Sequence, residues 1–126
     1  MSLRTPLGEV RGLGSAKEGT HHWWHQRLTA IALIPLGIWF VISLIVFTGA
    51  SHAEVAGWMA KPLNAGLLLL LIGATFYHLK LGVQVVIEDY VSTEWQKLTA
   101  IIVVTFGCIA LALASAIAVI LVMVSN

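Results

Sequence analysis

The residue with the clearest chemical potential is His78, which lies inside a long apolar stretch of the sequence. An imidazole in such a stretch needs a hydrogen-bond partner or a metal, because an unpaired polar group in an apolar medium is costly. Ala74 and Gly82, four residues before and after it, share its helix face. These small neighbours would let a haem pack there with its iron on the ring nitrogen, or let a neighbouring helix approach. We expect His78 to be either a haem ligand or a structural histidine, and the local sequence by itself favours the structural role.

A second group of candidates stands at the end of the same stretch. Asp89 lies eleven residues after His78, which is three helical turns plus about 20°, so both side chains point the same way if the helix continues. Tyr90 comes next, and Arg27 precedes the first apolar stretch. A cation, a carboxylate and a phenol at one membrane face suit a quinone, which needs a hydrogen-bond donor and a proton supply. Taken singly, the three also fit lipid phosphate binding, a solvated loop charge and an interfacial aromatic belt.

Other polar residues carry weaker signals. His21, His22 and His25 have the spacing of a helical metal pair, but without acidic co-ligands and beside two tryptophans they fit an interfacial cluster better. Lys80 has a stem long enough to extend toward the membrane surface. Cys108 is expected to be a small buried hydrophobe.

The composition indicates what kind of protein positions these residues. The 126-residue chain is 59% hydrophobic and 10% charged, whereas soluble domains carry about 25% charged residues. Apolar runs cover about residues 28–48, 64–87 and 98–124, and each is long enough to cross ~30 Å of hydrocarbon as a helix. The sequence therefore predicts an all-α integral membrane protein with three transmembrane helices, the first kinked at Pro35.

The distribution of Lys and Arg predicts the orientation in the membrane. The N-terminal flank and the second loop carry five such residues and the first loop carries one: Arg4, Arg11, Lys17, Arg27 and Lys97 against Lys61. We therefore expect a cytoplasmic N-terminal segment over residues 1–27, a membrane anchor domain over residues 28–126 and a periplasmic C-terminus. The net charge of +1 implies no polyanion-binding surface, so we expect no nucleic acid among the partners, whereas the apolar spans imply contact with membrane lipid.

The stretch FYHLKLGVQVVIEDYV, residues 76–91, contains an H-x-x-x-G…D-Y pattern. Together with three spans in about 120 residues and a basic segment ending in Arg27, this pattern resembles the smaller of the hydrophobic membrane anchors of succinate dehydrogenase (complex II). The motif match is confined to residues 26–29 and 76–91, whereas the architectural match covers nearly the whole chain.

The resemblance implies a role for each candidate residue. His78 would be an axial ligand of a b-type haem. Tyr90 would donate a hydrogen bond to a ubiquinone carbonyl, with Asp89 in the polar network beside it as a plausible proton route. Arg27 would lie near the haem propionates or the quinone pocket.

The same residues predict partners. A haem held by two histidines needs a second imidazole, and the sequence places one histidine deep in a span, so a second hydrophobic anchor, the cytochrome b subunit, would supply the other. One cysteine cannot hold an iron–sulfur cluster, so an iron–sulfur subunit and a flavoprotein subunit would oxidise succinate. We expect a subunit of succinate:ubiquinone oxidoreductase in a bacterial cytoplasmic (inner) membrane, without complete activity alone. The alternatives are a quinol:fumarate reductase anchor and a non-redox scaffold or transporter subunit in which His78 and Lys80 form a polar relay.

Overall fold

The computed structural model describes residues 5–12 and 19–126 and is helical in every regular element of them. The helices, in chain order, are α1 (Pro6–Val10), α2 (Gly19–Val46), α3 (His52–Ala60), α4 (Pro62–Tyr90) and α5 (Glu94–Ser125). In this described part, α2, α4 and α5 are long and apolar enough to cross a membrane. The predicted all-α fold with three transmembrane helices is confirmed. Arg4 and Lys17, which the predicted orientation counts, lie outside the described residues.

The three long helices extend beyond the apolar runs that predicted them. α2 begins at Gly19, so the histidine-rich segment belongs to the helix itself. α4 starts with Pro62 in its first turn, where proline lacks an N–H that would have no partner anyway, and it continues to Tyr90. An apolar run marks the length suited to hydrocarbon, whereas backbone hydrogen bonds continue the helix into polar sequence.

The first loop contains a helix that the sequence analysis does not predict. α3 begins at a capping box in which the backbone N–H and hydroxyl of Ser51 donate to Glu54 Oε2 at 2.8 and 2.7 Å. The backbone N–H of Glu54 in turn donates to the Ser51 oxygen at 3.3 Å. The Ser51 bonds, the backbone one first, hold the pKa of Glu54 below its ordinary value. The Ser-x-x-Glu spacing is the sequence signal that marks this helix start.

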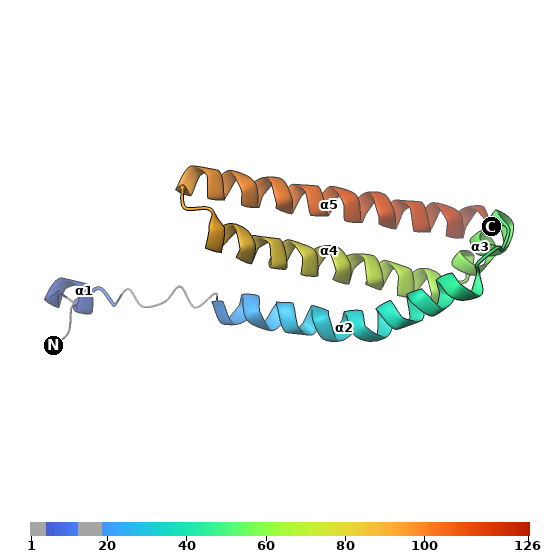
Figure 1. Ribbon diagram of the computed structural model, residues 1–126, viewed down its shortest axis with the longest axis horizontal. Helices are drawn as coiled ribbons and strands as arrows, with labels where there is room; N and C mark the ends of the chain where they lie inside the picture. Colours follow the sequence, from blue (N-terminus) through green and yellow to red (C-terminus); the bar gives the residue numbers. More distant parts are fainter. Residues whose placement is uncertain (1–4, 13–18) are drawn as a thin grey trace.

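The long helices lie in a row, with α4 between α2 and α5 (Figure 1). α2 and α5 both run antiparallel to α4, and α3 packs against α4 and α5 where the C-terminus also lies. We call this region the Trp58 end. The opposite end, which holds the start of α2, the last turns of α4 and the start of α5, is called the His78 end. α4 is therefore the helix that positions residues from both neighbours.

The Trp58 end contains a cluster of buried hydrophobic residues. Ala65, Leu68 and Val119 are buried there, and a ring of larger side chains packs around them: Trp39, Phe40, Trp58, Met59, Leu69, Ile72 and Met123. Trp39 stacks on Trp58 with ring centroids 5.6 Å apart. α2 is bent, as Pro35 predicts, since proline has no N–H for the carbonyl one turn earlier (Figure 1).

Candidate functional site

Side-chain contacts between α2 and α4 fix which residues lie at the same level in the His78 end. His25 contacts Tyr77, and both Gln26 and Thr29 contact His78. The part of α2 that precedes the apolar run therefore packs against α4 and is not a separate segment in front of the helices. His25 is consequently a second histidine near His78, in contact with the residue that precedes His78 on α4.

The His78 ring is held by a hydroxyl on α2. Thr29 Oγ1 lies 2.9 Å from His78 Nδ1. The same hydroxyl lies 2.8 Å from the carbonyl oxygen of His25 and 3.0 Å from that of Gln26, so its one hydrogen is donated to the backbone of its own helix. Thr29 Oγ1 can then accept a hydrogen bond from His78 Nδ1–H, an arrangement in which Nε2 carries the lone pair of the ring.

The other ring nitrogen faces a weaker partner. Gln26 Nε2 lies 3.5 Å from His78 Nε2, at the long limit of a hydrogen bond. Within the described residues, Gln26 Oε1 and His22 Nε2 are buried side-chain atoms without a hydrogen-bond partner. His22 precedes Gln26 by one turn of α2, so both orphaned atoms belong to one helix face. Orphaned polar atoms of this kind are rare in finished protein interiors.

The two small residues beside His78 do not form an open strip within this chain. A Cβ built on Gly82 would lie 3.6 Å from Gln26 Nε2, so α2 covers the glycine with the end of one flexible side chain. Ala74, one turn before His78, is half-buried. Of the two expectations for this face, the approach of a neighbouring helix is observed at Gly82. A haem at the same place would require the Gln26 side chain to move.

The structure does not gather the three residues expected at the membrane rim. Asp89 and Tyr90 end α4 as predicted, on a helix that is continuous from His78, and the Tyr90 side chain is 85% exposed. Arg27 lies level with Tyr77 instead, about twelve residues or ~18 Å further along the axis. Its guanidinium lies 5.6 Å from the ring of Trp23. Arg27 is thus separated from Asp89 and Tyr90 because the histidine-rich segment is helical and runs alongside α4.

Three residues of the site were not singled out from the sequence: Gln26, Thr29 and Tyr77. The Tyr77 hydroxyl lies 3.0 Å from His25 Nδ1, and the two ring centroids are 5.9 Å apart. All three lie inside the ranges of the motif match, residues 26–29 and 76–91, but their contacts depend on the register between two antiparallel helices, which the motif does not give. A polar hollow of about 330 Å³ opens beside them, lined by His21, His22, His25, Tyr77, Lys80, Leu81 and Gln84.

The histidine-rich segment does not form a metal centre by itself. Among the residues that the structure describes, no three His, Cys, Asp or Glu side chains are grouped to hold a metal ion. His25 uses Nδ1 in its contact with Tyr77. The interpretation of His21, His22 and His25 as an interfacial cluster stays a prediction.

Comparisons with known proteins agree with the architecture. The family model for the succinate dehydrogenase/fumarate reductase transmembrane subunit matches residues 1–124. The chain belongs to this family. It is 40% identical over 106 residues to a succinate dehydrogenase hydrophobic membrane anchor subunit of Rickettsia bellii, which covers 81% of this chain and 82% of the relative. It is 32% identical over 107 residues to the subunit of the same name from Paracoccus denitrificans, with coverage of 85% and 83%. No solved structure matches the chain.

Membership of this transmembrane subunit family confirms the recognition made from the H-x-x-x-G…D-Y pattern. The relatives are named as membrane anchor subunits of an enzyme complex, and a multi-pass membrane chain fits that name. The matched range includes both the His78 network and the Asp89-Tyr90 helix end.

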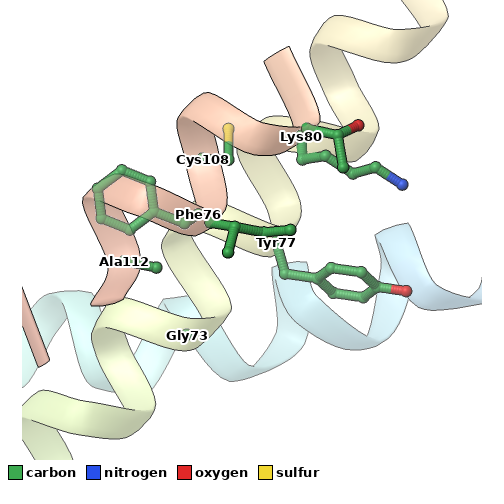
Figure 2. A pocket seen from close by; sticks show the side chains of 8 residues that line it. Gly73, Phe76, Tyr77, Lys80, Cys108 and Ala112 are labelled. Atoms are coloured by element: carbon green, nitrogen blue, oxygen red, sulfur yellow. The ribbon is translucent and has the colours of Figure 1, made fainter. Parts of the chain in front are cut away.

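The transmembrane subunit has a second hollow on the other side of Tyr77, between α4 and α5 (Figure 2). It measures about 280 Å³, and small residues make room for it: Gly73, Cys108 and Ala112. Phe76 and Cys108 line it, while Tyr77 extends toward α2 (Figure 2). Cys108 is buried, as expected. Lys80 borders both hollows and shares no ion pair in the described part of the chain.

Proposed function

We propose that this chain is the membrane-anchor subunit of a succinate:ubiquinone oxidoreductase, that it shares a b-type haem with a second anchor subunit, and that it contributes to the quinone-reduction site. The observation that carries the haem assignment is the contact between the Thr29 hydroxyl and His78 Nδ1 at 2.9 Å, which leaves Nε2 as the ring nitrogen that would bind iron. A haem-ligating histidine is a neutral imidazole that donates its other N–H to a fixed acceptor.

The residues around His78 fit a haem ligand on three grounds. Nε2 is the nitrogen that would bind iron, and its hydrogen-bond contact in the described residues is the long one to Gln26 Nε2 at 3.5 Å. That amide is not in a satisfied position, because its Oε1 is buried without a partner in the described region. Its side chain is flexible, so it can rotate away from Gly82 and His78. When bound, the haem would supply one-electron transfer.

A second polypeptide is needed to complete such a site. The group in front of His78 Nε2 in this chain is Gln26, and His25 is engaged with Tyr77. A second axial imidazole would therefore come from a partner, for which we propose the second hydrophobic anchor, the cytochrome b subunit. The single cysteine of the chain also leaves the iron–sulfur and flavin chemistry to further subunits.

For the quinone we propose the exposed end of α4. The Tyr90 hydroxyl would donate to a ubiquinone carbonyl. The Asp89 carboxylate would pass a proton from water to that carbonyl oxygen as the quinone is reduced. Arg27 lies at the level of His78, so we assign it to the haem propionates and not to the quinone pocket. A cation at that level would stabilise a carboxylate that reaches toward the aqueous side.

The location that accompanies this function is the bacterial cytoplasmic (inner) membrane. We propose that the His78 end faces the cytoplasm, because Arg27 and Lys97 lie there and Lys61 lies at the Trp58 end. The iron–sulfur and flavoprotein subunits would then dock on the side where α4 ends at Tyr90.

The haem assignment is tested by replacing His78 with Ala in the complete, purified complex. We expect loss or strong perturbation of the b-type spectrum, and an unchanged spectrum would refute the assignment. Gly82→Ala and Gly66→Ala form a matched pair on the same helix. A Cβ at Gly82 makes only an ordinary contact in this chain, and one at Gly66 meets nothing, so haem loss in the first variant alone would support close haem packing.

The quinone assignment is tested by Tyr90→Phe. We expect quinone reduction to fall while succinate oxidation with an artificial acceptor is spared, because only one hydroxyl is lost from an exposed side chain. Equal loss of both activities would contradict the assignment. A reverse preference, with quinol-dependent fumarate reduction exceeding succinate oxidation, would favour a fumarate reductase anchor, and a colourless complex would favour the scaffold.

A further inference from the structure

We propose that Thr29 is a positioning residue for the His78 ligand: by accepting the hydrogen bond from Nδ1–H it fixes the tautomer and orientation of the ring and strengthens electron donation from Nε2 to the haem iron. This inference rests on the proposed haem ligation by His78. It gives a role to a residue of α2, whereas the H-x-x-x-G…D-Y pattern that contains His78 lies on α4.

The argument begins with the single hydrogen of the Thr29 hydroxyl. Two carbonyl oxygens of its own helix, those of His25 and Gln26, lie 2.8 and 3.0 Å away and compete for that hydrogen. Nothing remains to donate to His78 Nδ1 at 2.9 Å, so the ring must be the donor. The backbone of α2 therefore sets the tautomer of a ring on α4.

The second contact of the ring is weaker and does not replace the first. Gln26 Nε2 lies at 3.5 Å from His78 Nε2, compared with 2.9 Å for the Thr29 contact. Departure of Gln26 on haem loading would leave the bond to Thr29 in place. The ring would then be anchored at Nδ1 and available at Nε2.

The electronic consequence follows from the direction of the bond. A ring that donates Nδ1–H gains negative character, which raises the basicity of Nε2 and stabilises oxidised iron. Removal of the acceptor should move the haem midpoint potential in the positive direction. It should also free the ring to rotate, and the loss of such an outer-shell partner typically weakens metal binding by about 10- to 100-fold.

The test uses the complete purified complex with three variants. Thr29→Val keeps the β-branched shape without the hydroxyl, and Thr29→Ser keeps the hydroxyl. Thr99→Val is the matched control. Like Thr29, Thr99 donates its hydroxyl to the carbonyl four residues earlier, here that of Trp95, but its contact in the described residues is to that backbone oxygen and not to a histidine ring. The measurements are the midpoint potential by redox titration, the low-spin electron paramagnetic resonance signal and the rate of haem loss.

We expect Thr29→Val to raise the potential, shift the low-spin signal and accelerate haem loss, while Thr29→Ser and Thr99→Val stay near the parent. A parent-like Thr29→Val variant, or an equal shift in Thr29→Ser or Thr99→Val, would overturn the role of the hydroxyl. In either case a His78→Ala complex that lacks the b-type spectrum would leave the haem ligation itself supported. A parent-like spectrum in His78→Ala would overturn both.

Discussion

The two ends of the helix row differ in the kind of side chain that joins the helices. At the Trp58 end, Ala65 and Leu68 are 1% and 7% exposed, and the aromatic rings of Trp39, Phe47 and Trp58 pack together. At the His78 end, α2 and α4 meet through imidazole, hydroxyl and amide groups, with a polar hollow beside them. The Trp58 end also has a hollow of about 640 Å³, lined in part by Trp39 and Phe47, and the His78 end also buries Leu81 and Ile87. The difference is that the His78 end contains buried polar atoms without a partner among the described residues.

The difference indicates a division of labour along the helices. Packing at the Trp58 end holds α3, α4 and α5 together and draws the bent half of α2 onto them. The His78 end can then keep polar groups whose partners come from outside the chain. Local violations of packing and hydrogen-bonding rules typically occur at functional sites, and stability elsewhere offsets their cost.

The largest effect that would distinguish the two ends is expected from Leu68→Ala. Replacement of a buried leucine by alanine leaves a cavity. Because lipid supplies little hydrophobic driving force between helices, we expect the free energy of unfolding to fall by about 2 kcal/mol, mainly through lost packing. Leu70→Ala is the matched control on the same helix, because Leu70 is 63% exposed. Thermal unfolding of the detergent-purified complex measures both. Equal destabilisation by the two variants would contradict a core at the Trp58 end.

A smaller loss is expected from Tyr77→Phe at the other end. The variant removes the hydroxyl that contacts His25 Nδ1 at 3.0 Å, and single hydrogen bonds between membrane helices contribute about 0.6 kcal/mol. A double-mutant cycle with His25→Phe isolates the pair, and Tyr90→Phe controls for loss of a phenol that is exposed. A coupling energy near zero would mean that the contact does not hold α2 to α4.

The sequence predicts these helices better than it predicts their contacts. Three apolar runs and Pro35 indicate three spans and a bend, and spacing alone puts His78 and Asp89 on one continuous helix. The register between α2 and α4 is set by packing over many turns, so neither the Thr29–His78 bond nor the displacement of Arg27 from Tyr90 could be read from local pattern. α3 was not predicted although its capping signal is present in the sequence, because a helix of 9 residues is too short to form an apolar run of spanning length.

Replacement of Gln26 should sharpen the comparison by having almost no effect on stability. Gln26→Leu removes a weak contact of Nε2 at the long limit of hydrogen bonding, which costs stability. It also removes the buried Oε1, which has no partner among the described residues, and this gain offsets the cost. We expect the free energy of unfolding to change by less than about 0.5 kcal/mol. Gln96→Leu on the exposed start of α5 is the control. A loss as large as that of Leu68→Ala would show that the His78 end is a core in its own right.

The smallest effect concerns acid sensitivity at the Trp58 end, and its sign follows from the capping box. Ser51 hydrogen bonds lower the pKa of Glu54 below 4.5, so ionised Glu54 stabilises the start of α3. That contribution is present above the unfolded-state pKa and is lost as the pH falls through the lower folded-state pKa. Glu54→Gln keeps a hydrogen-bonding side chain but no charge. The difference in stability between the parent and Glu54→Gln should therefore be largest near neutral pH and should disappear as the pH falls below about 4.5. Thermal unfolding at a series of acidic pH values measures this difference. A difference that persists unchanged in acid would mean that the charge of Glu54 does not stabilise α3.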